Sequence, residues 1–186
     1  MTTVRVRANL APSRLCIERQ NRCGTRLTWG IIMRMRTIAR SADLEALLER
    51  LGRLTPDSGR RWGTMTPSEM LCHLGDAAEM ALRIRPRQKP FPARGRLIVK
   101  LFGLWTPVRW PHGWPTNASQ DPRRSGTRPS QFAADLQRVM NATRALAASD
   151  GTSLEPVHGL FGTMTLADWH RWAWKHTDHH LRQFGL

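Results

Sequence analysis

Two histidines near the end of the chain, His176 and His180, stand four residues apart in the segment TLADWHRWAWKHTDHHLRQFGL. A step of four residues on an α-helix turns about 40° and rises about 6 Å, so both imidazoles point to the same side. Trp169, Trp172 and Ala173 share that stripe, which predicts that it faces the core. Because neutral imidazole is the commonest protein ligand of a metal ion, the pair indicates a metal site. The alternative is that such histidines only interact with the negative end of a helix, the role expected for His179.

A second segment, TPSEMLCHLGDAAEMAL from Thr66 to Leu82, supplies another histidine. Thr66 is a good N-cap, Pro67 suits the first helical position, and Glu69 completes a capping box. The apolar residues that follow have helical spacing, and His73 falls on or beside their buried stripe. A lone core histidine is usually just hydrogen-bonded, but one that lies opposite an H-x-x-x-H pair is a candidate third ligand.

Three phrases, RWGTMTPSEMLCHLGD, HGLFGTMTLADW and KHTDHHLRQFG, resemble the DinB/YfiT-like superfamily, in a branch catalogued as a domain of unknown function. The resemblance runs from about Met35 to the C-terminus. It implies a four-helix bundle that holds one divalent metal through three histidines, and these match His73, His176 and His180. Related members include metal-dependent thiol transferases, a maleylpyruvate isomerase and hydrolase-like proteins, among which the resemblance does not select.

The helical signals fit an all-α, DinB/YfiT-like four-helix bundle. Ser41 is expected to cap the first helix, and Thr165, with Asp168 three residues later, the last. A long connection rich in proline and tryptophan is expected as a crossover between helices two and three, and the resemblance implies an up-down-down-up order. The expected helices span residues 41–51, 66–85, 129–148 and 165 onward, with the connection at 86–128.

Neighbouring polar residues could orient the three histidines. Asp76 lies three residues after His73, and Gln183 lies three after His180. An oxygen that accepts the free ring N–H of a ligand fixes its tautomer, so we expect these two residues to fill that role. The alternative is a solvated surface side chain, which is the expectation for Asp178. Cys72 is interpreted as a small buried apolar residue.

Aromatic residues are expected to form the wall of a pocket over the metal. The alternatives are ordinary core at the end of the bundle, or contact with a membrane surface, since Arg94, Arg96, Lys100 and Arg109 interleave with the aromatics of the connection. His158 is expected to be a loop residue without a role. The predicted wall residues are Phe102, Trp105, Trp110 and Trp169, and Trp114 could join them.

The first 36 residues hold eight arginines and a single acid, Glu18, so they contribute +7 of the net charge of +15. Residues 1–34 are therefore expected to be a disordered basic arm or a targeting peptide, ahead of a domain at 35–186. The alternative is that the true start is Met33 or Met35 and that the first 32 residues are not part of the protein. Arginine outnumbers lysine 26 to 3, which fits a codon bias. No zinc finger, RRM-type motif or helix-turn-helix is recognisable, so nucleic acid is not an expected partner.

The sequence predicts a metal-dependent enzyme in which one divalent transition metal, with zinc or nickel expected first, activates water or a low-molecular-weight thiol. The reaction would be hydrolysis or thiol transfer on an unidentified small molecule, and a homodimer is the expected state. The alternative is a non-enzymatic basic bundle that binds an acidic partner and holds a structural or adventitious metal. Three cysteines without a C-x-x-C pair, and no apolar run of about twenty residues, favour a cytoplasmic protein without a membrane partner.

Overall fold

The computed structural model describes residues 35–87 and 95–186. The chain divides between residues 32 and 33 into two units, and all described elements belong to the second unit, Met33–Leu186. The predicted disordered segment 1–34 lies outside the described residues, as does Arg94.

The second unit is helical, as the sequence predicts. A short antiparallel pair of strands, with Val157 opposite Thr163, precedes the last helix. The elements are α1 (Ser41–Gly52), α2 (Pro67–Ala81), α3 (Arg96–Trp105), the 3₁₀ turn η1 (Ala118–Gln120), α4 (Phe132–Ala148), β1 (Val157–His158), β2 (Gly162–Thr163) and α5 (Leu166–Gln183).

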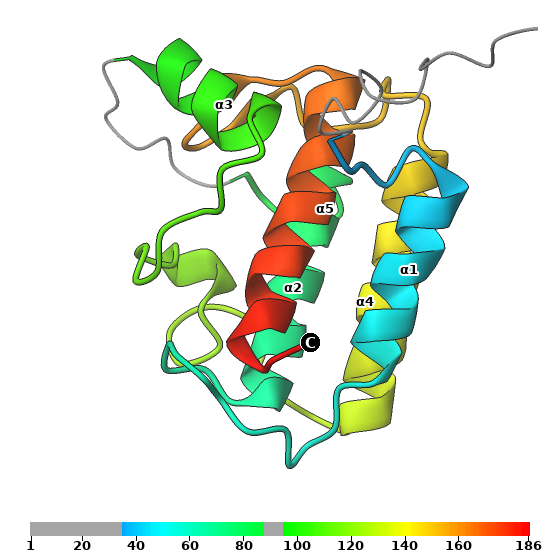
Figure 1. The fold of residues 1–186 in the computed structure, drawn as a ribbon, viewed down its shortest axis with the longest axis vertical. Coiled ribbons are helices and arrows are strands. Elements are labelled where there is room, and N and C mark those ends of the chain that lie inside the picture. Colours follow the sequence, from blue (N-terminus) through cyan, green and yellow to red (C-terminus); the bar gives the residue numbers. More distant parts are fainter. Residues whose placement is uncertain (1–34, 88–94) are drawn as a thin grey trace, which may run out of the picture. The chain divides into compact units, whose positions relative to one another are not determined.

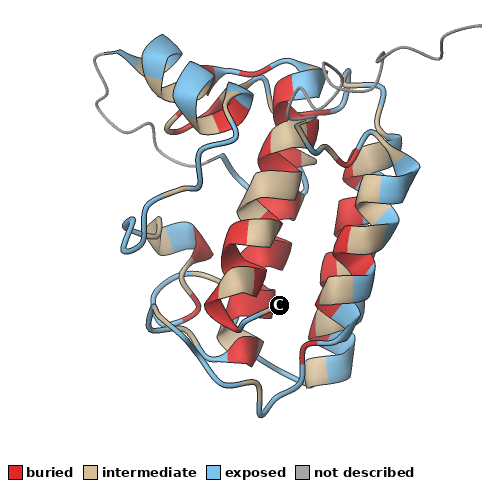
Figure 2. Cartoon of the chain, viewed as in Figure 1, coloured by how far each residue is buried: buried red, intermediate tan, exposed pale blue. Residues whose placement is uncertain are grey.

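Four of the helices, α1, α2, α4 and α5, lie side by side as a bundle (Figure 1). Helices α2 and α4 run in the same direction, opposite to α1 and α5, which is the expected up-down-down-up order. Two parallel neighbours cannot be joined by a tight turn, so a long crossover connects α2 to α4. The buried sides of the four helices face one another (Figure 2). This confirms the predicted all-α bundle.

The crossover contains a helix that the sequence analysis did not predict. Residues 86–128 were expected to be a long connection, and no helix was assigned to them, but α3 occupies Arg96–Trp105. Apolar residues at positions 97, 98, 101, 102 and 105 do recur with helical spacing, so the signal was present. The helix differs from the other four because this apolar face is largely exposed.

The ends of the two histidine-bearing helices follow the predicted chemistry. In both, the N-cap threonine accepts the N3 amide, and the N3 carboxylate accepts the N-cap amide, so each has a complete capping box. The predicted cap of α1 is wrong: Arg40 is the N-cap, without a side-chain bond, and Ser41 is the first helical residue.

The bundle core consists of side chains such as Leu51, Leu71, Trp169 and Leu181, each no more than 1% exposed. Cys72 is fully buried there, and burial raises the pKa of its thiol to about 12. A thiol with so high a pKa is unreactive, which agrees with its interpretation as a small apolar residue. No helix among the described residues is long and apolar enough to cross a bilayer.

Candidate metal centre

Three histidines from two neighbouring helices meet inside the bundle. His73 projects from α2, and His176 and His180 project from successive turns of α5. Nε2 of His176 lies 3.0 Å from Nε2 of His73 and 3.2 Å from Nε2 of His180. One ring nitrogen from each residue therefore lies within 4.8 Å of the other two, close enough for all three to bind one metal ion.

The tautomers of two of these histidines follow from their outer hydrogen bonds. Nδ1 of His73 lies 2.9 Å from the backbone oxygen of Gln120, and Nδ1 of His180 lies 2.8 Å from Oε1 of Gln183. A carbonyl oxygen only accepts, so each Nδ1 carries a proton and donates it. In the neutral ring, the Nε2 lone pair is then free and directed toward the other histidines.

Burial keeps the three rings neutral. It is the main cause that lowers the pKa of His73 below its ordinary value and the pKa values of His176 and His180 well below theirs. Charge repulsion between the histidines lowers the pKa of His176 and His180 further. Neutral imidazoles with converging lone pairs repel one another unless a cation or a shared proton lies between them. This donor set fits a divalent transition metal.

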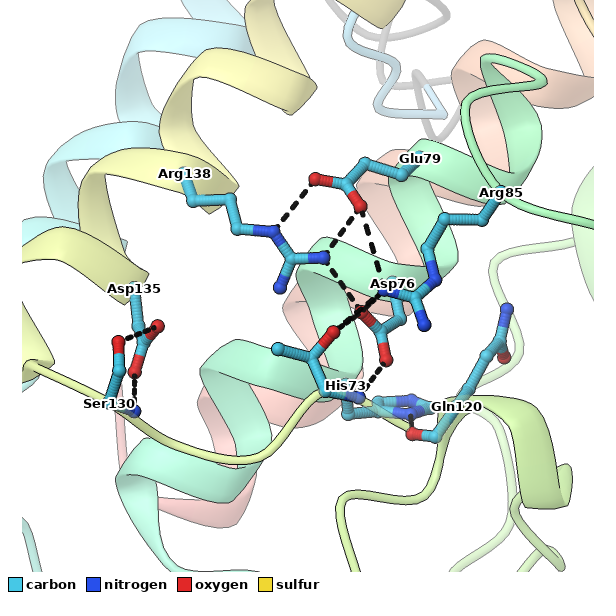
Figure 3. A network of polar contacts seen from close by, with 9 residues as sticks. His73, Asp76, Glu79, Arg85, Gln120, Ser130, Asp135 and Arg138 are labelled. Atoms are coloured by element: carbon cyan, nitrogen blue, oxygen red, sulfur yellow. Dashed lines mark hydrogen bonds and ion pairs between the residues drawn. The ribbon is translucent and has the colours of Figure 1, made fainter. Parts of the chain in front are cut away.

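The group that orients His73 is not the one that the sequence analysis expected. Gln183 does accept from His180, but no hydrogen bond joins Asp76 to His73. Both oxygens of Asp76 accept from Thr127, at 2.7 Å from its amide nitrogen and 2.6 Å from its hydroxyl. Asp76 also pairs with Arg85 and Arg138 (Figure 3). It thus holds the loop that carries Gln120, and its negative charge also acts on His73 directly, because it raises the pKa of that ring against the effect of burial.

A partly open cavity of about 770 Å³ lies beside the three histidines, all of which line it. Of the four predicted wall residues, Phe102 and Trp110 line the cavity, but Trp105 and Trp169 do not. The indole of Trp105 turns away and donates to Asp168 at 2.7 Å. Trp169 is buried in the core and donates to the backbone oxygen of Glu155.

The sequence model of the DinB superfamily matches residues 33–184, which is most of the chain. The chain belongs to the DinB superfamily. It has no significant match among curated proteins or among solved structures.

The crossover of this DinB-superfamily protein is fastened to α5 near the cavity. Oδ2 of Asp168 accepts from Lys100 at 2.9 Å, while Oδ1 accepts from Trp105. Lys175 donates to the backbone oxygens of Thr106 and Val108. One carboxylate, Asp168, therefore both caps α5 and holds α3, which places Phe102 at the cavity.

Several cavity residues of this DinB-superfamily protein were missed or misjudged. His179 was expected only to interact with the helix end, but it is buried and lies edge-on to Trp62 at 4.7 Å. Burial lowers its pKa to about 4. His158, expected in a loop without a role, is a buried residue of β1 that lines the cavity with Phe161. Trp172 could have been found, because it shares the helical stripe of His176.

Proposed function

We propose that this chain binds one divalent transition metal through His73, His176 and His180 and acts as a metal-dependent enzyme. The observation that carries the proposal is the convergence of three Nε2 atoms, at 3.0 and 3.2 Å, with two Nδ1 atoms held by acceptors. Such a metal would supply Lewis acidity, which activates a water or a thiol. Hydrolysis and thiol transfer are the two proposed reaction classes.

The chain's own residues would prepare the site for that chemistry. The Gln120 carbonyl and the Gln183 amide fix the tautomers of two ligands, so the rings need no reorientation to bind. The cavity beside the ligands has room for a small molecule. Three neutral ligands leave a divalent ion its full charge, which favours an anionic or polarised group in the cavity. Zinc and nickel are proposed first, because imidazole binds both well.

The test is the metal content of untagged protein, measured by elemental mass spectrometry. We expect about one metal per chain in the wild type, and little in His73→Ala and in the double variant His176→Ala/His180→Ala. His112→Ala is the matched control, because His112 is exposed and lies outside the triad. Equal metal in all variants would refute the site. Protein that stays metal-free after reconstitution would leave the non-enzymatic bundle as the better hypothesis.

A further inference from the structure

The opening of the cavity is apolar. Eight large apolar side chains among the described residues are 40–68% exposed, and four of them line the cavity: Ile98, Phe102, Val108 and Trp114. Because these four residues both line the cavity and are exposed, they lie at its opening to solvent. Apolar side chains gathered at such an opening are typical of a ligand site, because an apolar ligand removes them from water.

The wall of the cavity is aromatic. Trp62, Trp110, Trp114 and Trp172 line it, which is half of the eight tryptophans in the chain. The indole of Trp62 already stacks on the ring of His112, with centroids 3.8 Å apart. Aromatic pairs stabilise a contact beyond the area that they bury. A wall of this composition favours a ligand with a flat aromatic body.

One exposed arginine at the cavity, Arg109, offers a partner to an anion. Three residues with permanently charged side chains line the cavity, Arg109, Asp121 and Arg123. Arg123 is neutralised by two short bonds to Glu69. Asp121 accepts the backbone amide of Arg123 and keeps its negative charge. Arg109 is exposed, and forms no ion pair with a carboxylate of residues 35–87 or 95–186. One cation at the cavity is therefore left for a ligand.

We propose that the cavity binds an aromatic organic anion, whose ring packs on the tryptophan wall and whose anionic group pairs with Arg109. The inference rests on the proposed function, because it treats the cavity beside the three histidines as the substrate site. It deepens that function by naming the chemical class of the substrate.

The test is isothermal titration of the full chain, after removal of metal with EDTA, with three probes. These are 2-naphthoate, the neutral 2-naphthalenemethanol and the aliphatic anion octanoate. We expect 2-naphthoate to bind one to one, and about two- to fivefold more tightly than the alcohol, the range of an exposed ion pair. Octanoate should bind more weakly than 2-naphthoate. No binding of 2-naphthoate, or equal binding of octanoate, would overturn the proposal.

Two variants locate the probe. Arg109→Gln should abolish the preference for 2-naphthoate over the alcohol, while Arg144→Gln, which removes an exposed arginine of α4 away from the cavity, should keep it. Phe102→Ser should weaken both aromatic probes about three- to tenfold. Phe102 is 63% exposed, so its loss should leave the fold intact. An unchanged preference in Arg109→Gln would overturn the assignment of the anion site.

The two proposals fail separately. The titration uses metal-free protein, so a chain that binds no metal can still bind 2-naphthoate. Conversely, absence of 2-naphthoate binding leaves the measured metal content unaffected.

Discussion

At the scale of single residues, the hydrogen bonds of the outer ring nitrogens fix the tautomer and the orientation of two of the three histidines. The Gln183 side chain holds Nδ1 of His180, and a backbone carbonyl holds Nδ1 of His73. A side-chain acceptor can be removed by substitution, whereas a backbone acceptor cannot. Gln183 is therefore the residue through which the orientation of a ligand can be tested.

Gln183→Met should weaken metal binding about 10- to 100-fold, because His180 loses the acceptor that fixes its tautomer. Affinity is measured by competition with a chromophoric chelator. Gln137→Met, on the exposed face of α4, is the matched control and should leave the affinity unchanged. Wild-type affinity in Gln183→Met would show that this hydrogen bond does not prepare the site.

His158 makes the stability of the fold depend on pH. Its Nδ1 accepts the backbone amides of Leu160 and Phe161, and burial lowers its pKa from 6.5 to about 3. The unfolded chain therefore binds a proton at this site at higher pH than the folded chain. The stabilisation is complete above about pH 6.5, and is lost as the pH falls toward 3.

His158→Asn should flatten this dependence, because the Asn oxygen can accept the same amides and does not titrate. The free energy of unfolding of metal-free protein is measured by urea denaturation between pH 7 and pH 4. We expect a smaller loss on acidification in the variant than in the wild type. Parallel curves would mean that other groups, such as His170, whose pKa is also lowered by burial, cause the acid sensitivity.

At the scale of elements, the carboxylates that complete the capping boxes of α2 and α5 also bind side chains of other segments. Glu69 completes the capping box of α2 and also binds Arg123 of the crossover. The hydrogen bond from Arg123 is the main cause that lowers the pKa of Glu69 to about 2. Asp168 likewise completes the capping box of α5 and accepts a hydrogen bond from Lys100 of α3. Each histidine helix is thereby joined at its first turn to the segment that forms the cavity.

Thr66→Ala should destabilise the protein by about 0.5–2 kcal/mol, because the amide of Glu69 loses its acceptor. Thr66→Ser keeps the hydroxyl, and should recover most of the loss. Both are measured by thermal and urea unfolding. If the two variants were equally unstable, the methyl group and not the cap would be responsible.

At the scale of the whole molecule, a buried ionic network joins α2, α4 and the end of the crossover. Asp76 is fully buried, and its oxygens meet Arg85, Arg138 and Thr127 (Figure 3). Arg138 also binds Glu79 through two nitrogens. The network ties together segments that are about fifty to sixty residues apart in the sequence.

Asp76→Ala should destabilise the fold by about 3–5 kcal/mol, because Arg85 and Arg138 each lose a buried carboxylate partner and the amide and hydroxyl of Thr127 lose their acceptor. Glu49→Ala, which breaks an exposed pair with Arg53 on α1, is the control and should change stability by about 0–1 kcal/mol. Urea denaturation measures both. Similar small losses in the two variants would show that the buried network contributes no more than a surface pair.

Much of the fold and part of the site could be predicted because their causes are local. The capping boxes at Thr66 and Thr165 need only residues three apart, and the shared direction of His176 and His180 follows from helical geometry. Gln183 likewise lies one turn beyond His180 on the same helix. Helix α3 was missed, although its spacing was visible, because no capping side chain marks its start: its N-cap is Gly95.

The sequence by itself determined the helical bundle, the start of each histidine helix and the two ligand-bearing faces, because these depend on contacts within a few residues. Only the tertiary structure decided what surrounds the histidines. The Gln120 carbonyl lies 47 residues from His73 in the chain, and Trp105 turns to Asp168 instead of the cavity. Such contacts depend on the path of the crossover, which is fixed by long-range ion pairs and hydrogen bonds that no local pattern encodes.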